Sequence, residues 1–73
     1  MTARQRNILD HLAAIPERMA YRVGSSRNYG HVGRWTASYP HPRVWFADAD
    51  IAELQRQGKL VPWRGHNDAL ILP

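Results

Sequence analysis

The chain has 73 residues and no cysteine, and this combination most constrains what it can fold into. A chain of this length buries only about 60% of the surface that its unfolded form exposes, so its core is thin. Disulfides and cysteine-bound zinc, which stabilise many domains of this size, are excluded. Stability must therefore come from packing, and three tryptophans, three tyrosines and one phenylalanine are the main material for it. Of these, Tyr21, Trp35 and Tyr39 are predicted to be core residues, because they alternate with polar or small residues. We expect one domain over residues 1–73, acting as a monomer.

Arginine dominates the charge of the chain. Nine of the ten basic residues are arginine, against six acidic residues, and the net charge is +4. Residues 1–47 hold seven arginines and two acidic residues, a net charge of +5, whereas residues 48–73 hold three basic and four acidic residues, a net charge of −1. This asymmetry predicts a basic face that binds an acidic macromolecule, since arginine pairs well with phosphate and carboxylate groups. Arginines that only keep the fold soluble are the alternative interpretation.

The first segment is predicted to be a helix that begins after Thr2 and ends before Pro16. Gln5 follows Thr2 by three residues, which is the spacing of a capping box. Ile8, Leu12 and Ile15 then recur at helical spacing and form one apolar face. Proline disfavours the helical conformation of the residue before it, so the helix stops there.

The rest of the chain is predicted to be mostly strands, with one more helix. Alternating side chains favour strands around residues 19–23 and 34–39, separated by an exposed glycine-rich loop over 24–33, with extended structure again at 43–46. Asp48 or Asp50 is expected to cap a second helix, with Gly58 at its C-terminal end. A hairpin of 60–63 and 69–72 follows, with its turn over 64–68. Pro62 predicts that the first hairpin strand lies at a sheet edge.

No catalytic or metal-binding pattern stands out. The histidines His11, His31, His41 and His66 lack the close spacing of a ligand motif and are interpreted as surface residues. The serines have no nucleophile-elbow context, and a chain this small rarely forms a water-excluding cleft. We therefore expect a non-enzymatic protein without cofactor or metal. With no signal peptide or apolar membrane span in the sequence, we expect it in the cytoplasm and not at a membrane.

Both ends of the sequence resemble a winged-helix domain. The start, Thr2 to Leu9, reads Thr-x-Arg-Gln-x-x-Ile-Leu, and residues 51–60 form a helix-Gly-Lys-Leu ending that leads into the hairpin. The resemblance implies an α+β fold in which two helices pack on a short antiparallel sheet with a C-terminal hairpin. It does not cover residues 19–46, which look like strands where such domains place a helix.

DNA-binding winged-helix proteins insert the helix before the wing into the major groove, with its N-terminal residues facing the bases. In this chain that end carries Asp48, Asp50 and Glu53. Three carboxylates facing a polyanion oppose this docking mode. Any nucleic acid is therefore expected on the basic face formed by Arg22, Arg27, Arg34 and Arg43.

By its length and its order of elements, the whole chain is also similar to the small transcription regulators of lytic Xanthomonas phages. That resemblance implies a regulator that binds host RNA polymerase in the bacterial cytoplasm, inhibits initiation and promotes antitermination. A sequence-specific winged-helix repressor and a phage inhibitor of another host nucleic-acid system remain as alternatives. Residues 1–6 are expected to form a flexible basic arm. The predicted partner-binding residues are Met1, Thr2, Arg4, Arg6, Arg22, Arg27, Tyr29, Arg34 and Arg43.

Overall fold

The computed structural model describes residues 1–23, 34–37 and 44–73. In these residues the chain forms two helices and a five-stranded antiparallel sheet, which confirms the predicted α+β class. The elements in chain order are α1 (Ala3–Ala14), β1 (Met19–Arg22), β2 (Trp35–Ala37), β3 (Val44–Phe46), α2 (Asp48–Arg56), β4 (Val61–Trp63) and β5 (His66–Ile71). Neither helix in this part of the chain is long and apolar enough to cross a bilayer.

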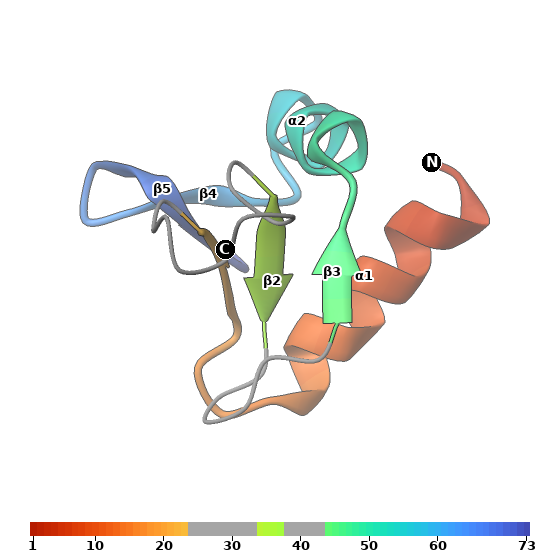
Figure 1. The fold of residues 1–73 in the computed structure, drawn as a ribbon, viewed down its shortest axis with the longest axis horizontal. Coiled ribbons are helices and arrows are strands. Elements are labelled where there is room, and N and C mark those ends of the chain that lie inside the picture. Colours follow the sequence, from red (N-terminus) through yellow and green to blue (C-terminus); the bar gives the residue numbers. More distant parts are fainter. Residues whose placement is uncertain (24–33, 38–43) are drawn as a thin grey trace.

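The first strand, β1, lies in the middle of the sheet and joins two hairpins. The strand order is β3-β2-β1-β5-β4, so β2–β3 lies on one side of β1 and the C-terminal hairpin β4–β5 on the other (Figure 1). Strand β4 is an edge strand, as Pro62 predicted, because proline cannot donate a ladder hydrogen bond. The C-terminal hairpin expected after the second helix is present as β4 and β5. The β2–β3 hairpin stands where a winged-helix domain has a helix, and the family assignment stays a prediction.

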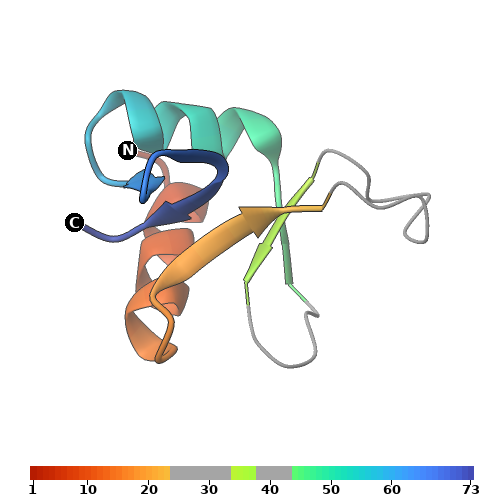
Figure 2. The same cartoon turned by 90° about the vertical axis from the view of Figure 1, so that its left-hand side faces the viewer.

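One core fills the space between the helices and the sheet. The register pairs Ala20 with Leu70 and Trp35 with Phe46, so these four side chains share one face of the sheet. Figure 2 shows the two helices lying together beside the strands. The buried apolar residues are Ile8, Leu12, Ala20, Trp35, Ala37, Phe46, Ile51, Leu54, Leu60 and Leu70.

The capping box predicted from Thr2 and Gln5 is present. The Gln5 amide donates to the Thr2 hydroxyl, and the Thr2 amide donates to Gln5 Oε1, each over 3.1 Å. Helix α1 therefore begins at Ala3, and Arg4 and Arg6 lie in its first turn. The expected arm over residues 1–6 is corrected accordingly: after Met1 and the cap residue, these residues belong to the helix.

Replacing Thr2 with alanine is expected to destabilise the protein by about 1 kcal/mol, because an amide of the first turn loses its acceptor. Urea denaturation followed by circular dichroism measures this loss. Thr2→Ser keeps the hydroxyl and should stay close to the wild type. Equal losses in the two variants would show that the cap hydroxyl contributes nothing.

Helix α2 begins differently from the prediction. Its N-cap is Ala47, and no side chain caps it, so neither Asp48 nor Asp50 has the predicted role. Both aspartates lie inside the first turn, where the helix dipole stabilises their charge. Their side chains instead contact other elements, as described below.

The C-terminal end of α2 follows the prediction more closely. Gly58 has φ +75°, and the Lys59 amide donates to the Leu54 carbonyl over 2.9 Å, which is a Schellman motif. On the last turn, hydrogen bonds from Arg56 and then Gln57 lower the pKa of Glu53 to about 2.

The turn of the C-terminal hairpin is shorter than expected. It consists of Arg64 and Gly65 alone, with φ values of +50° and +80°, and Trp63 pairs directly with His66. Two consecutive residues with positive φ define the type I′ turn, whose twist matches that of the two strands. The strand β5 therefore begins at His66, two residues after Arg64.

Candidate functional site

The structure distributes the predicted partner-binding residues over several surfaces. Met1 is 56% exposed at the start of the chain, and Thr2 is the helix cap. Arg4 and Arg6 are both exposed, but they are two positions apart on α1 and therefore point to opposite sides of the helix. Arg34 is exposed just before β2. Three further predictions, Arg27, Tyr29 and Arg43, lie outside the described residues.

Arg22 is held by interactions within the protein. It lies opposite Trp35 in the β1–β2 register, and its guanidinium carbon is 4.9 Å from the centre of the indole ring. Its nitrogens are 3.4 Å from Asp48 and 3.9 Å from Asp68. A partner would have to compete with these carboxylates for Arg22.

The basic and acidic parts of the sequence are in contact in the folded chain. Arg4 on α1 lies 3.5 Å from Asp50 on α2, and Arg22 on β1 pairs with Asp48. These ion pairs join residues 46 and 26 positions apart. Folding brings basic and acidic residues together at these two contacts. The predicted basic face of Arg22, Arg27, Arg34 and Arg43 stays a prediction, because Arg27 and Arg43 lie outside the described residues.

Asp50 connects the starts of the two helices. It is 6% exposed, accepts a hydrogen bond from Gln5 Nε2 over 3.3 Å and pairs with Arg4. Gln5 is itself 7% exposed and also closes the capping box. The buried carboxylate thus fixes the first turn of α1 next to the first turn of α2, and Arg4 is left above it with its side chain 79% exposed.

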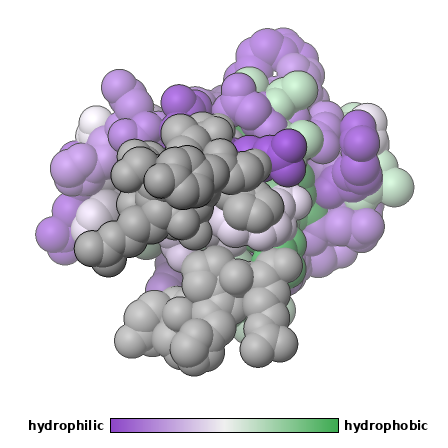
Figure 3. Space-filling view, viewed as in Figure 1, coloured by the Kyte–Doolittle hydropathy of each residue, from purple (hydrophilic) through white to green (hydrophobic). Residues whose placement is uncertain are grey.

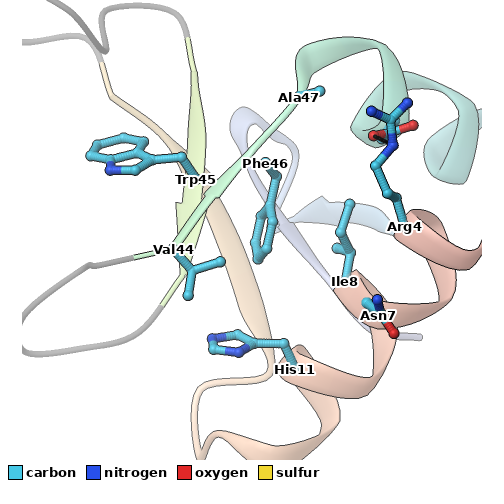
Figure 4. Close-up of a pocket in the computed structure, with 9 residues that line it drawn as sticks. Arg4, Asn7, Ile8, His11, Val44, Trp45, Phe46 and Ala47 are labelled. Carbon is cyan, nitrogen blue, oxygen red and sulfur yellow. Dashed lines mark ion pairs between the residues drawn. The ribbon is translucent and has the colours of Figure 1, made fainter.

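A groove lies between α1 and the edge strand β3. We call it the β3 groove; its volume is about 420 Å³, and it is lined by Arg4, Asn7, Ile8, His11, Val44, Trp45, Phe46, Ala47 and Asp50. Figure 4 shows Ile8, Val44 and Phe46 pointing into the space between the two elements, whereas the Trp45 ring points to the other side of the strand. The surface view shows apolar residues at this place, bordered by hydrophilic residues on the helix side (Figure 3).

His11 lies in the β3 groove and is not the surface histidine that the sequence suggested. Its ring packs edge-on against Phe46, with centroids 6.0 Å apart. Its Nε2 is buried and has no hydrogen-bond partner within the described residues. A buried polar atom without a hydrogen-bond partner lowers the stability of the folded state.

A second hollow lies next to the β3 groove. This Arg34 hollow has a volume of about 460 Å³ and is lined by Arg34, Trp45, Phe46, Ala47 and Asp48. It shares Trp45, Phe46 and Ala47 with the β3 groove. The two hollows therefore share residues of β3 and of its connection to α2, and Arg4 lines one hollow whereas Arg34 lines the other.

The tip of the C-terminal hairpin forms a separate cluster. The Arg64 guanidinium carbon is 4.9 Å from the centre of the Trp63 ring, and His66 stacks on the same tryptophan with centroids 5.8 Å apart. Arg64 and His66 are exposed and Trp63 is half-buried. Such a cluster resembles the arginine and aromatic pairs that stack on nucleic-acid bases.

The other aromatic residues divide between the core and the opposite face of the sheet. Trp35 is 1% exposed and belongs to the core, as predicted. The prediction for Tyr21 is corrected: it is half-buried and lies on the face of the sheet opposite Ala20 and the core. Burial and then the neighbouring Glu17 carboxylate raise its pKa. Tyr39, also predicted to be a core residue, lies outside the described residues.

Asn7, Ile8, His11, Val44 and Phe46 were not predicted as site residues. The spacing of Arg4, Asn7, Ile8 and His11 places them on one face of a helix, which is a signal that could have been found. Nothing in the sequence shows that β3 lies beside that face. In the part of the chain that the structure describes, no group of three or more histidine or acidic residues could hold a metal ion.

No protein-family model, curated protein or solved structure matches the chain.

Proposed function

We propose that this chain is a non-enzymatic transcription regulator that binds the RNA polymerase of a bacterial host in the cytoplasm, inhibits initiation and promotes antitermination. The similarity of its length and element order to small phage regulators supports the choice of partner. The observation that carries the proposal is the surface around β3, where the β3 groove and the Arg34 hollow meet between two exposed arginines. An apolar groove flanked by charges is typical of a protein-binding surface.

A protein partner fits this surface better than duplex DNA does. The first turn of α2, which a winged-helix protein would direct at the bases, carries the Asp48 carboxylate with its side chain 66% exposed. Asp68 lies beside it, 74% exposed. Exposed carboxylates repel phosphates and oppose docking of this helix end in the major groove.

In this proposal the apolar groove and the exposed arginines contribute to different properties of binding. A partner side chain in the β3 groove would provide most of the affinity, because buried apolar anchors dominate interface energetics. Arg4 and Arg34 would attract acidic segments of the polymerase and raise the association rate, a contribution that falls with salt.

A DNA-binding repressor is the second candidate, and the hairpin tip is the observation that favours it. Arg64, Trp63 and His66 could contact a phosphate and a base at the position of a wing. In that case DNA affinity would fall steeply with salt concentration and would depend on Arg64.

Affinity capture separates the two candidates. The tagged chain is incubated with nuclease-treated lysate of a Xanthomonas host, and the retained proteins are identified by mass spectrometry. Retention of polymerase subunits in stoichiometric amounts supports the proposal. If polymerase is absent and proteins are retained only after DNA is restored, the proposal is wrong and the repressor becomes the leading account.

A further inference from the structure

We infer that the β3 groove and the Arg34 hollow together bind an extended peptide segment that has apolar side chains at its centre and carboxylates on both sides. This inference rests on the proposed function and names the chemistry of the polymerase segment that the same surface takes. Its basis is the arrangement of one apolar groove and two arginines along β3.

An apolar side chain of the partner fits the centre of this surface. Ile8, Val44 and Phe46 point into the β3 groove from two different elements (Figure 4). Ile8 and Phe46 are each 5% exposed, so the floor of the groove is part of the protein core. A leucine or phenylalanine of the partner placed there would remove apolar surface from water on both sides.

Carboxylates of the partner fit the two ends of this surface. Arg4 keeps its side chain 79% exposed although its Nε faces Asp50, so the remaining guanidinium donors are open to a partner. Arg34 is exposed at the second hollow and makes no ion pair within the described residues. The two arginines flank the shared residues Trp45, Phe46 and Ala47, so a ligand along this path meets a positive charge at each end. Asp48 also lines the Arg34 hollow, but its carboxylate is paired with Arg22 over 3.4 Å.

The shape of the surface favours an extended segment over a single small molecule. The two hollows share residues of one short strand and of the connection that follows it. An extended chain advances about 3.3 Å per residue, so a hexapeptide covers roughly 20 Å, more than the length of the three-residue strand β3.

The first test is a nuclear magnetic resonance titration of the ¹⁵N-labelled chain with the acetylated hexapeptide Asp-Glu-Leu-Phe-Glu-Asp. We expect saturable shifts of the Asn7, His11, Val44 and Phe46 amides. Asp-Glu-Ser-Ser-Glu-Asp lacks the apolar centre, and Lys-Lys-Leu-Phe-Lys-Lys reverses the flanking charge; both should shift these amides far less. Equal shifts with all three peptides, or none with the first, would overturn the inference.

A pair of charge variants locates the binding. Asn7→Glu places a carboxylate at the groove, and Ala13→Glu makes the same change in charge at an exposed position on the opposite side of α1. We expect Asn7→Glu to weaken binding of the acidic peptide roughly tenfold, because like charges meet at the interface. Ala13→Glu should change the affinity by less than about twofold, the residual long-range effect of an exposed charge. Equal losses would show that the groove is not the site.

Polymerase capture by the same variants separates this inference from the proposed function. If the wild type and Asn7→Glu retain polymerase equally, the groove inference fails and the proposed function stands. If the peptide binds in the groove but polymerase is not retained, the proposed function fails and the groove remains a peptide-binding site.

Discussion

Replacing Trp35 with alanine is expected to lower the free energy of unfolding by about 3–5 kcal/mol, a large share of the total stability of this chain. Trp35 is 1% exposed at the centre of the core, and truncating a buried tryptophan costs about 3–5 kcal/mol. The change also removes the ring beneath Arg22 and the Nε1 hydrogen bond of 3.0 Å to Asp48. At roughly 0.05–0.15 kcal/mol per residue, a chain of this length has a total stability of only about 4–11 kcal/mol.

Far-ultraviolet circular dichroism and urea denaturation measure this loss. Trp45→Ala is the matched control, since Trp45 is half-buried and its ring points away from the β3 groove (Figure 4). The control should fold and lose clearly less stability. A Trp35→Ala protein with a cooperative transition near that of the wild type would contradict the central place of this residue in the core.

The second large effect is expected at Asp50. Asp50→Ala should destabilise the protein by about 2 kcal/mol, because it leaves the buried amide of Gln5 without its acceptor. It also removes a negative charge from the first turn of α2, where the helix dipole favours one. The ion pair with Arg4 adds little to this loss, since Arg4 is mostly exposed.

Asp50→Asn is the control for this prediction, because it keeps an oxygen that can accept from Gln5 while removing the charge. We expect it to lose less than half as much stability as the alanine variant in urea denaturation. The double variant with Gln5→Ala should show a coupling energy of about 1 kcal/mol. Additive losses would mean that Gln5 and Asp50 do not stabilise each other.

Much of the fold could be predicted because its signals are local. Thr2 and Gln5 specify the start of α1 through a contact between residues three apart. Pro62 marks an edge strand because it lacks an amide hydrogen, and Gly58 ends α2 because its φ is positive. Each of these follows from the chemistry of one residue or of close neighbours.

The candidate site could not be predicted in the same way, because it depends on which distant elements meet. The β3 groove exists because His11 and Ile8 on α1 face Val44 and Phe46 on β3. The charge distribution along the sequence does not predict such contacts either: Arg4 and Asp50 belong to different parts of the sequence but meet in space. The hairpin turn was predicted over residues 64–68, longer than the observed two-residue turn. The reason is that a non-glycine residue with positive φ, such as Arg64, is uncommon.

Equilibrium titration of the fluorescently labelled chain against purified Xanthomonas RNA polymerase tests the central claim most directly. The buffer is free of nucleic acid and at physiological salt, and a parallel titration uses duplex DNA. We expect saturation at one chain per polymerase with a Kd below about 1 μM, corresponding to roughly −8 kcal/mol, and much weaker binding to DNA. Absence of polymerase binding together with tight, salt-sensitive binding to DNA would contradict the account.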